Sequence, residues 1–231
     1  MDRYGLIGYP ISHSLSPQLF SEAYDGLLPY ELVETPDFDE AWDIFIRDFK
    51  AVNVTMPFKS LAAARADVIA KDVERTGSAN ILVKENGLVK ACNSDCYAVA
   101  RILGRLKADH GIASVAIIGT GGAGRAAFAA SEDCGLETSV FHHDGIKDGA
   151  CADIIIYTLP SFVEGARHLK CRFVLEANYR NPSLESLNIT DPEGRPAEYI
   201  GGKIWLRAQA AGGFETMTGQ KISDNFTIWQ R

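Results

Sequence analysis

The sequence predicts an α/β protein with two domains, an N-terminal open and mostly parallel sheet followed by a doubly wound sheet. Apolar strand-like runs alternate with segments of helical composition through the first half of the chain. At about residue 97 the pattern changes, and a long helical segment leads into an apolar strand and a glycine-rich turn. We therefore expect a first domain over 1–96 and a second over 97–206.

In the first half, strands alternate with helices. We expect strands at 4–8, 30–35 and 51–56, and helices at 16–27 and 38–49. The first helix opens at a serine cap, and the second has an apolar face and a polar face. A further strand is expected at 88–91.

In the second half, a helix is expected to end at Gly111, and the glycine-rich turn follows a buried strand at 115–118. Later apolar runs favour further strands within 138–141, 152–160 and 172–179, and the stretch 205–217 has helical composition.

The composition limits the partners. The chain is 46% apolar and carries a formal charge of −7 without a lysine or arginine cluster, which argues against nucleic acid or an anionic membrane. No apolar run approaches a membrane span and the start lacks a signal-peptide layout, so we expect a cytoplasmic protein. The five cysteines form no CxxC pair, which favours neither a disulfide framework nor a metal site. A small anionic metabolite is compatible with this composition.

The glycine-rich turn predicts a Rossmann-like dinucleotide site. Gly119, Gly121 and Gly124 satisfy GxGxxG between a strand and an alanine-rich helix, with Gly122 and Ala123 between the glycines. These glycines allow a tight turn, close approach of the backbone to a diphosphate and close packing of helix on strand. The diphosphate would lie at the helix N-terminus.

The residues after the next strand lie where the ribose of the dinucleotide is expected to bind. Asp144 follows Gly124 at about the distance where an acidic residue binds the 2′-hydroxyl of NAD. His142 and His143 would instead offer partial positive charge to the 2′-phosphate of NADP, and all three residues also fit a solvated loop.

Polar residues also gather where strands of the first domain end. Lys59 follows the strand that stops at Pro57, Asn80 ends the motif TGSAN, and Asp95 ends ACNSD. Ligands usually bind beside the carboxyl ends of strands in open α/β sheets. Lys59 and Asp95 suit a general acid–base pair, although such residues more often form a plain surface ion pair.

Six stretches together carry a family resemblance. In order they are GYPISHSLSP, NVTMPFK, GSAN, NSD, GTGGAG and LRAQAAGGFE, and they span nearly the whole chain. The chain resembles shikimate dehydrogenases. The resemblance implies a substrate-binding domain over 1–96 that is completed by about 207–231, and reversible reduction of 3-dehydroshikimate to shikimate with a nicotinamide cofactor, usually NADP, in aromatic amino acid biosynthesis.

The resemblance also implies roles for individual residues. Lys59 matches the family's general acid–base, and Asp95 matches its partner and a ligand to a ring hydroxyl. Ser14 and Ser16 match serines that bind the substrate carboxylate. The other matching substrate contacts are Thr55, Asn80, Tyr179 and Gln209. The glycine loop with His143 and Asp144 would hold the cofactor, and a monomer or homodimer is expected.

Two departures from the family keep alternatives open. The stretch between Asp144 and Ala152 is short where the family usually has a helix and another strand, so the cofactor domain is trimmed. Trp205 stands where the family has a methionine near the nicotinamide. The alternatives are an enzyme that prefers NAD or acts on quinate, and a protein that binds the metabolite without efficient turnover.

Overall fold

The computed structural model describes residues 2–146 and 149–229. It divides into unit 1, with residues up to 94 and from 209, and unit 2, with residues 95–208. The outermost residues of the predicted substrate domain, 1 and 230–231, lie outside the described part, and so do 147–148 in the predicted short segment. The labels of substrate domain and cofactor domain stay predictions.

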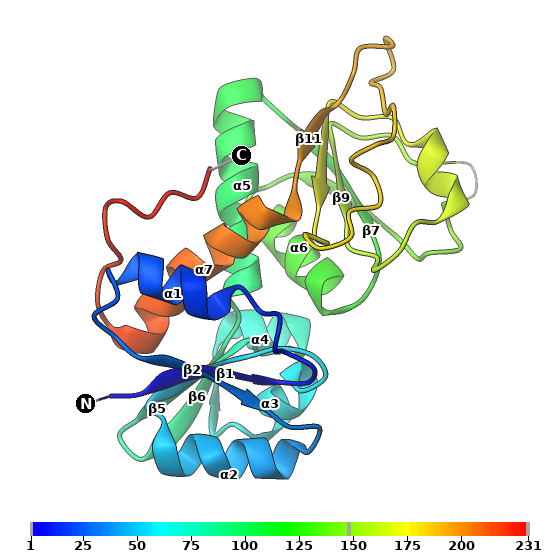
Figure 1. The fold of residues 1–231 in the computed structure, drawn as a ribbon. Coiled ribbons are helices and arrows are strands. Elements are labelled where there is room, and N and C mark those ends of the chain that lie inside the picture. The colour runs from blue at the N-terminus through cyan, green and yellow to red at the C-terminus, as the bar shows by residue number, and fades with distance from the viewer. Residues whose placement is uncertain (1, 147–148, 230–231) are drawn as a thin grey trace. The chain divides into compact units, whose positions relative to one another are not determined.

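Unit 1 contains a mixed sheet (Figure 1). Its strands are β1 (Tyr4–Gly8), β2 (Tyr30–Glu34), β3 (Ala51–Val54), β4 (Val68–Ile69), β5 (Ile81–Glu85) and β6 (Leu88–Cys92). Among the described residues the strand order is β2-β1-β3-β5-β6-β4, and only the pairings of β5 are antiparallel. The mostly parallel sheet is therefore confirmed, with one antiparallel insertion.

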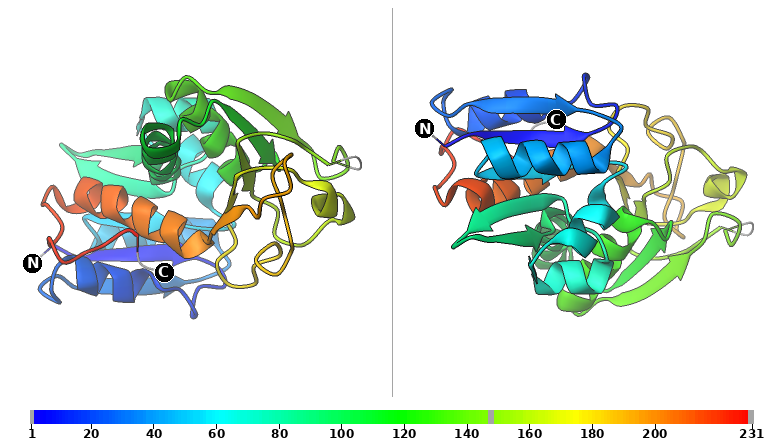
Figure 2. Two further views of the ribbon diagram at one scale, coloured as in Figure 1. Left: turned by 90° about the horizontal axis from the view of Figure 1, so that it is seen from above. Right: turned by 90° about the horizontal axis from the view of Figure 1, so that it is seen from below.

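Helices cover both faces of this sheet (Figures 1 and 2). On one face, α2 (Phe38–Asp48) packs Trp42 and Phe45 into a core with Val52 and Val54. Its N-cap, Asp37, accepts backbone hydrogen bonds from the first turn. The shorter helices of unit 1 are α1 (Ser16–Ala23), α3 (Lys59–Arg65) and α4 (Lys71–Thr76).

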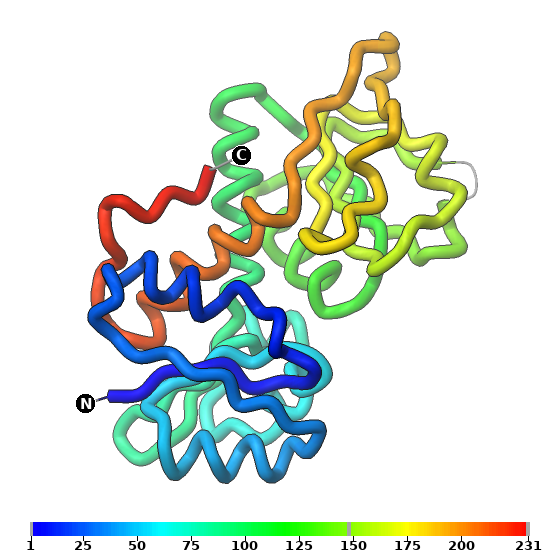
Figure 3. The backbone as a smooth tube through the Cα atoms, in the orientation of Figure 1, coloured from blue at the N-terminus to red at the C-terminus, as the bar shows by residue number. Residues whose placement is uncertain are grey.

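Helix α1 differs from the prediction at both ends. Leu15 is its N-cap and Ser16 its first helical residue, so the predicted serine cap was wrong. The helix ends at Ala23 rather than 27 because Asp25 and Gly26 adopt the left-handed conformation, with φ of 50° and 72°. The C-terminal segment returns beside this helix, where the Ser223 amide donates to the Ala23 carbonyl at 2.8 Å (Figure 3).

Unit 2 contains a parallel sheet. Its strands are β7 (Ser114–Ile118), β8 (Glu137–Phe141), β9 (Ile154–Tyr157), β10 (Phe173–Glu176) and β11 (Glu198–Ile200). The order β11-β10-β9-β7-β8 places β8 and β9 on opposite sides of β7, which is the doubly wound arrangement. The helices are α5 (Ser94–His110), α6 (Gly122–Asp133), the 3-10 helix η1 (Glu164–His168) and the first residues of α7 (Gly202–Thr218).

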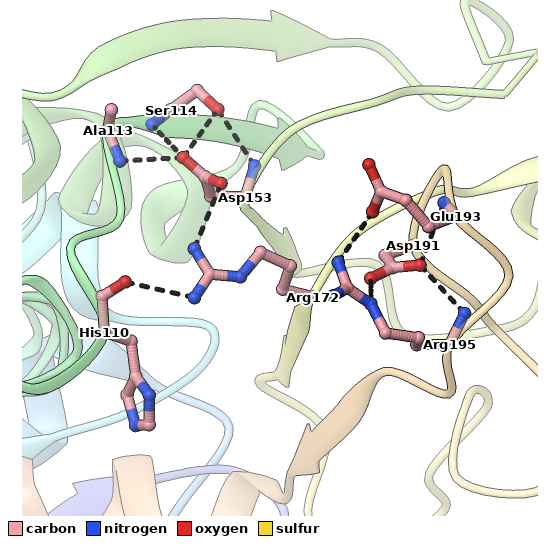
Figure 4. A network of polar contacts seen from close by, with 8 residues as sticks. All are labelled: His110, Ala113, Ser114, Asp153, Arg172, Asp191, Glu193 and Arg195. Atoms are coloured by element: carbon pink, nitrogen blue, oxygen red, sulfur yellow. Dashed lines mark hydrogen bonds and ion pairs between the residues drawn. The ribbon is translucent and has the colours of Figure 1, made fainter.

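The described residues between β8 and β9 form turns and an isolated bridge at Cys151, so β8 is an edge strand. Where strands β7 and β9 begin, Asp153 accepts hydrogen bonds from the Ala113 and Ser114 amides at 2.8 and 3.1 Å (Figure 4). Burial acts to raise the pKa of the Asp153 carboxyl, but these bonds and Arg172 outweigh it and lower that pKa below its ordinary value. Asp153 thereby ties the α5–β7 loop to β9.

Within the described ranges, no helix is long and apolar enough to cross a membrane.

Candidate active site

Strand register brings four segments of unit 1 to one edge of its sheet. Ile7 pairs with Val54, and the next residues are Gly8 and Thr55. Ile81 pairs with both Asn53 and Cys92. Asn80 was expected at the carboxyl end of a strand, but it precedes β5. Because β5 is antiparallel to β3, its start still reaches the edge where β1, β3 and β6 end.

The chain makes a close approach at this edge. A Cβ on Gly8 would lie 2.4 Å from the Thr55 side chain, so glycine is required here. The Tyr9 amide donates to the Met56 carbonyl at 3.0 Å, which fixes the loop after β1 to the loop after β3. Thr55 lies beyond the end of β3 because the chain turns there, with the Phe58 amide donating to the Thr55 carbonyl.

Ser14 and Ser16 form a hydroxyl pair at the start of α1. The Ser14 hydroxyl donates to the Ser16 hydroxyl at 3.1 Å and accepts from the Ser16 amide at 3.2 Å. The Ser14 amide donates to the Ile11 carbonyl at 2.9 Å, which fixes the turn. Both side chains are half-buried, so the pair is ordered and still accessible.

Two further polar residues, Tyr30 and Asn53, lie between this pair and Asn80. The Tyr30 phenol lies near the Ser16 hydroxyl and donates to Asn53 Oδ1 at 2.8 Å. Asn53 Nδ2 donates in turn to the Asn80 carbonyl at 3.3 Å. Burial raises the pKa of Tyr30 far above its ordinary value, and the nearby Ser16 hydroxyl offsets only part of that, so Tyr30 stays a neutral donor.

Asn80 and Gln209, both predicted substrate contacts, lie together. Asn80 Nδ2 donates to Gln209 Oε1 at 3.3 Å and to the Ser94 hydroxyl at 3.1 Å. The Ser94 amide donates back to Asn80 Oδ1 at 2.8 Å. Ser94 was not a candidate, although it lies within the motif NSD. Asn80 is buried whereas Gln209 is half-buried, so an amide group faces the accessible part of this edge.

The predicted catalytic residues both begin helices. Lys59 is the first residue of α3 and is half-buried. Its backbone carbonyl accepts a hydrogen bond from the Ala79 amide at 2.9 Å. Asp95 lies in the first turn of α5, where the helix dipole favours a carboxylate. Lys59 belongs to unit 1 and Asp95 to unit 2, so their pairing stays a prediction. Trp205 Nε1 donates to Asp95 Oδ1 at 3.2 Å within unit 2.

The glycine loop of unit 2 has the geometry that a diphosphate needs. Gly119 has a φ of 112°, and a Cβ on Gly124 would lie 2.0 Å from the Gly119 carbonyl oxygen. A Cβ on Gly121 would instead meet no atom within 4 Å. Gly121 is the N-cap of α6 and makes no side-chain cap bond, so the first amides of that helix are open to an anion. These residues fit a dinucleotide.

The end of β8 lies beside this loop, because the Gly119 amide donates to the Phe141 carbonyl at 2.8 Å. His142, His143 and Asp144 follow and are exposed, and His142 Nδ1 hydrogen-bonds to Asp144 Oδ1 at 2.8 Å. This bond lowers the pKa of the Asp144 carboxyl. The rings of His142 and His143 are 4.2 Å apart, and the ligand atoms of all three residues lie within 4.8 Å, close enough to surround one small ion.

Tyr179 lies in a loop of unit 2 that is anchored by a buried carboxylate. Glu176 accepts hydrogen bonds from the Ser183 and Leu184 amides at 2.5 and 3.1 Å and from the Tyr199 phenol at 2.8 Å. Tyr179 itself is half-buried. Its predicted contact with a substrate carboxylate stays a prediction.

Known proteins share both the sequence and the fold. Residues 6–82 match the model of the shikimate dehydrogenase substrate binding domain. The NADP(+) shikimate dehydrogenase of Thermus thermophilus is 28% identical over 95% of this chain and 87% of its own length. That of Halobacterium salinarum is 38% identical over 67% of this chain and 60% of its own length. A structure of the Thermus thermophilus shikimate dehydrogenase in complex with shikimate superposes with a TM-score of 0.80, at 25% identity, over 96% of this chain and 95% of that one.

The chain belongs to the shikimate dehydrogenase family. The family resemblance inferred from the six motifs is thereby confirmed, as is the two-domain α/β architecture. Tyr30, Asn53 and Ser94 are polar residues of this site that were not predicted as contacts. Asn53 and Ser94 lie within the motifs NVTMPFK and NSD, so the sequence carried a signal for both, whereas Tyr30 lies outside the six motifs.

Proposed function

We propose that the protein reversibly reduces 3-dehydroshikimate to shikimate with NADPH, as a step in aromatic amino acid biosynthesis. The observation that carries the proposal is the polar edge of unit 1, which carries the Ser14–Ser16 hydroxyl pair and, joined by hydrogen bonds, Tyr30, Asn53, Asn80 and Gln209. The names of the relatives, which specify shikimate and NADP(+), support the same assignment.

The two serines would bind the carboxylate of the substrate. A carboxylate oxygen accepts charge-assisted hydrogen bonds, and two hydroxyls in a rigid turn supply them without a full counter-charge. Thr55, Asn80 and Gln209 would bind the ring hydroxyls, because their hydroxyl and amide groups both donate and accept. Tyr179 would close the carboxylate end of the site.

Lys59 would act as the general acid–base. In the reducing direction its ammonium donates a proton to the carbonyl oxygen of 3-dehydroshikimate while the carbonyl carbon receives a hydride. The hydride is supplied by NADPH when it is bound. Asp95 would hold the lysine and accept a hydrogen bond from a neighbouring ring hydroxyl. In the reverse direction Lys59 takes the hydroxyl proton back.

The cofactor would lie along the glycine loop, with its diphosphate over Gly121 and the start of α6. We assign the 2′-phosphate of NADP to His142 and His143, which are exposed beside the loop. The carboxylate of Asp144 accepts the hydrogen bond from His142, which engages part of its capacity to bind a ribose hydroxyl. Discrimination between NADP and NAD would therefore rest on these three side chains.

Lys59→Ala tests the mechanism, and Lys71→Ala is the matched control because Lys71 also begins a helix of unit 1 and is exposed. Absorbance at 340 nm reports formation of NADPH from shikimate. We expect Lys59→Ala to lower kcat by about 10²- to 10⁴-fold, the span for a general acid–base, and to change shikimate binding only a few fold. Lys71→Ala should behave as the wild type. A Lys59→Ala enzyme with most of its turnover would remove Lys59 from the mechanism.

A second candidate function is metabolite binding without efficient turnover. The edge position of β8, which leaves this side of the cofactor unit without the usual further strand, favours it. Calorimetric binding of shikimate together with weak binding of both NADPH and NADH would support this candidate. Quinate, assayed with each cofactor in parallel, tests the remaining substrate alternative. A cytoplasmic location and a monomeric or dimeric state stay predictions.

A further inference from the structure

Trp205 makes a buried hydrogen bond to the predicted catalytic carboxylate. The side chains come from the start of α7 and the start of α5, and both residues belong to unit 2. Trp205 is 4% exposed and Asp95 is 6% exposed. The 3.2 Å separation between Trp205 Nε1 and Asp95 Oδ1 is within the range of a hydrogen bond.

The chemistry of this donor matters. An indole N–H donates and never accepts, so it can pair only with a lone pair of the carboxylate. The family resemblance implies a methionine at this position, whose thioether cannot donate. Relative to a methionine, Trp205 adds a donor directed at Asp95, besides adding volume.

We propose that Trp205 is a positioning residue that holds Oδ1 of Asp95, so that the carboxylate presents a fixed orientation to Lys59 and to a ring hydroxyl of the substrate. The inference rests on the proposed function. It assigns to the indole a supporting role in catalysis.

Burial is the reason that this hydrogen bond should affect the rate. Water readily replaces a lost donor at an exposed carboxylate, but it has little access to a residue that is 6% exposed. Loss of the indole N–H would leave Asp95 freer to rotate, and misplacement of a catalytic group by about 1 Å can cost 10²-fold in rate.

The test uses Trp205→Phe, which keeps an aromatic ring and removes the donor, and Trp205→Met, which keeps a flexible apolar chain. We expect both to lower kcat about tenfold and to weaken calorimetric binding of shikimate about tenfold, as loss of a hydrogen bond to a charged group does. The KM for NADP should stay within twofold. Trp42→Phe is the control, because Trp42 is similarly buried in the core of unit 1.

A double-mutant cycle separates positioning from a merely structural role. If Trp205 acts through Asp95, Trp205→Phe has less than a twofold further effect on shikimate binding and kcat in an Asp95→Ala background. An equal effect in both backgrounds would overturn the proposal, and so would unchanged binding and kcat in the single variants. The binding arm needs no turnover, so a protein that binds shikimate without oxidising it would refute the proposed function and still decide this inference.

A spectroscopic readout on the intact wild-type chain covers the case in which the Trp205 variants do not fold. The indole N–H of Trp205 should exchange slowly with solvent in the wild type, and its proton resonance should shift in Asp95→Ala. An unchanged resonance would contradict the hydrogen bond on which the inference depends.

Discussion

Gly121→Ala should weaken cofactor binding without weakening the fold. The backbone at Gly121 has φ of −70° and ψ of −171°, which alanine adopts without strain. An added Cβ meets no protein atom within 4 Å, so the folded chain has room for it. In the proposed function the diphosphate approaches the loop through that space, and a methyl group there would push the diphosphate away from the first amides of α6.

The size of the effect follows from the bonds that would be lost. A hydrogen bond to a charged group contributes about 1.5–3 kcal/mol. Displacement of the diphosphate from one such amide therefore raises the Kd for NADP about 10- to 100-fold, since 1.4 kcal/mol corresponds to a factor of ten. The free energy of unfolding should change by less than about 0.5 kcal/mol, because the side chain replaces no contact.

Gly124→Ala is the matched comparison within the same loop. Its Cβ would lie 2.0 Å from the Gly119 carbonyl oxygen and 2.8 Å from the Gly119 carbonyl carbon. Both are backbone atoms, so α6 must move away from the end of β7. We expect a loss of about 1–3 kcal/mol in the free energy of unfolding, the usual cost of overpacking, together with weaker cofactor binding.

Two assays separate these outcomes. Calorimetry gives the Kd of NADP, and urea unfolding gives the stability of each variant. Shikimate binding in the absence of cofactor should match the wild type for Gly121→Ala. A Gly121→Ala protein that binds NADP as tightly as the wild type would refute the placement of the diphosphate over this residue. A Gly124→Ala protein of unchanged stability would refute the packing argument.

Three further predictions concern the polar network, the ribose end and pH. Tyr30→Phe removes the phenol that hydrogen-bonds to Asn53 near Ser16, so the KM for shikimate should rise about fivefold with kcat within twofold. An unchanged KM would show that this phenol does not support substrate binding. Asp144→Asn should raise the preference for NADP over NAD, and His143→Ala should lower it, measured as the ratio of kcat/KM values. A higher NADP preference in His143→Ala would overturn the assignment of the 2′-phosphate to the histidines, and an unchanged ratio in Asp144→Asn would show that this carboxylate does not contact the 2′ position. The pKa of Asp153 is lower in the folded chain than its unfolded value of about 3.9, so the ionised carboxylate stabilises the fold above that pH, and this stability is lost as the pH falls through the folded-state pKa. Asp153→Asn should therefore lower the free energy of unfolding by about 1–2 kcal/mol at pH 7 and by progressively less below about pH 4. A difference in urea stability that stayed constant with pH would contradict this.

The parts of the fold that depend on local pattern were predictable. The alternation of strands and helices up to residue 56 and the strand, turn and helix around Gly119 follow directly from periodicity and glycine chemistry. The antiparallel pair β5 and β6 was not anticipated, although the sequence carried a signal for it. Asn86 and Gly87 separate the two strands and adopt φ of 52° and 79°, as an Asn-Gly hairpin turn requires.

The contacts that complete the site depend on register and on distant segments. Tyr30 in β2 and Asn53 in β3 lie on the two strands that flank β1, and their side chains hydrogen-bond across β1. No local sequence pattern specifies this strand order. Trp205 and Asp95 are 110 positions apart in the chain, and their hydrogen bond depends on how α7 packs against α5. The motifs identified Asn80 and Gln209 separately, and the hydrogen bond between their side-chain amides becomes apparent only in the folded chain.

The proposed function requires that this chain oxidises shikimate and does not merely bind it. The most direct measurement is the initial rate of absorbance increase at 340 nm with purified wild-type protein, shikimate and NADP, with calorimetric binding of shikimate on the same sample. We expect saturable NADPH formation in a sample that binds shikimate. Shikimate binding with no NADPH or NADH formed from either cofactor would contradict it.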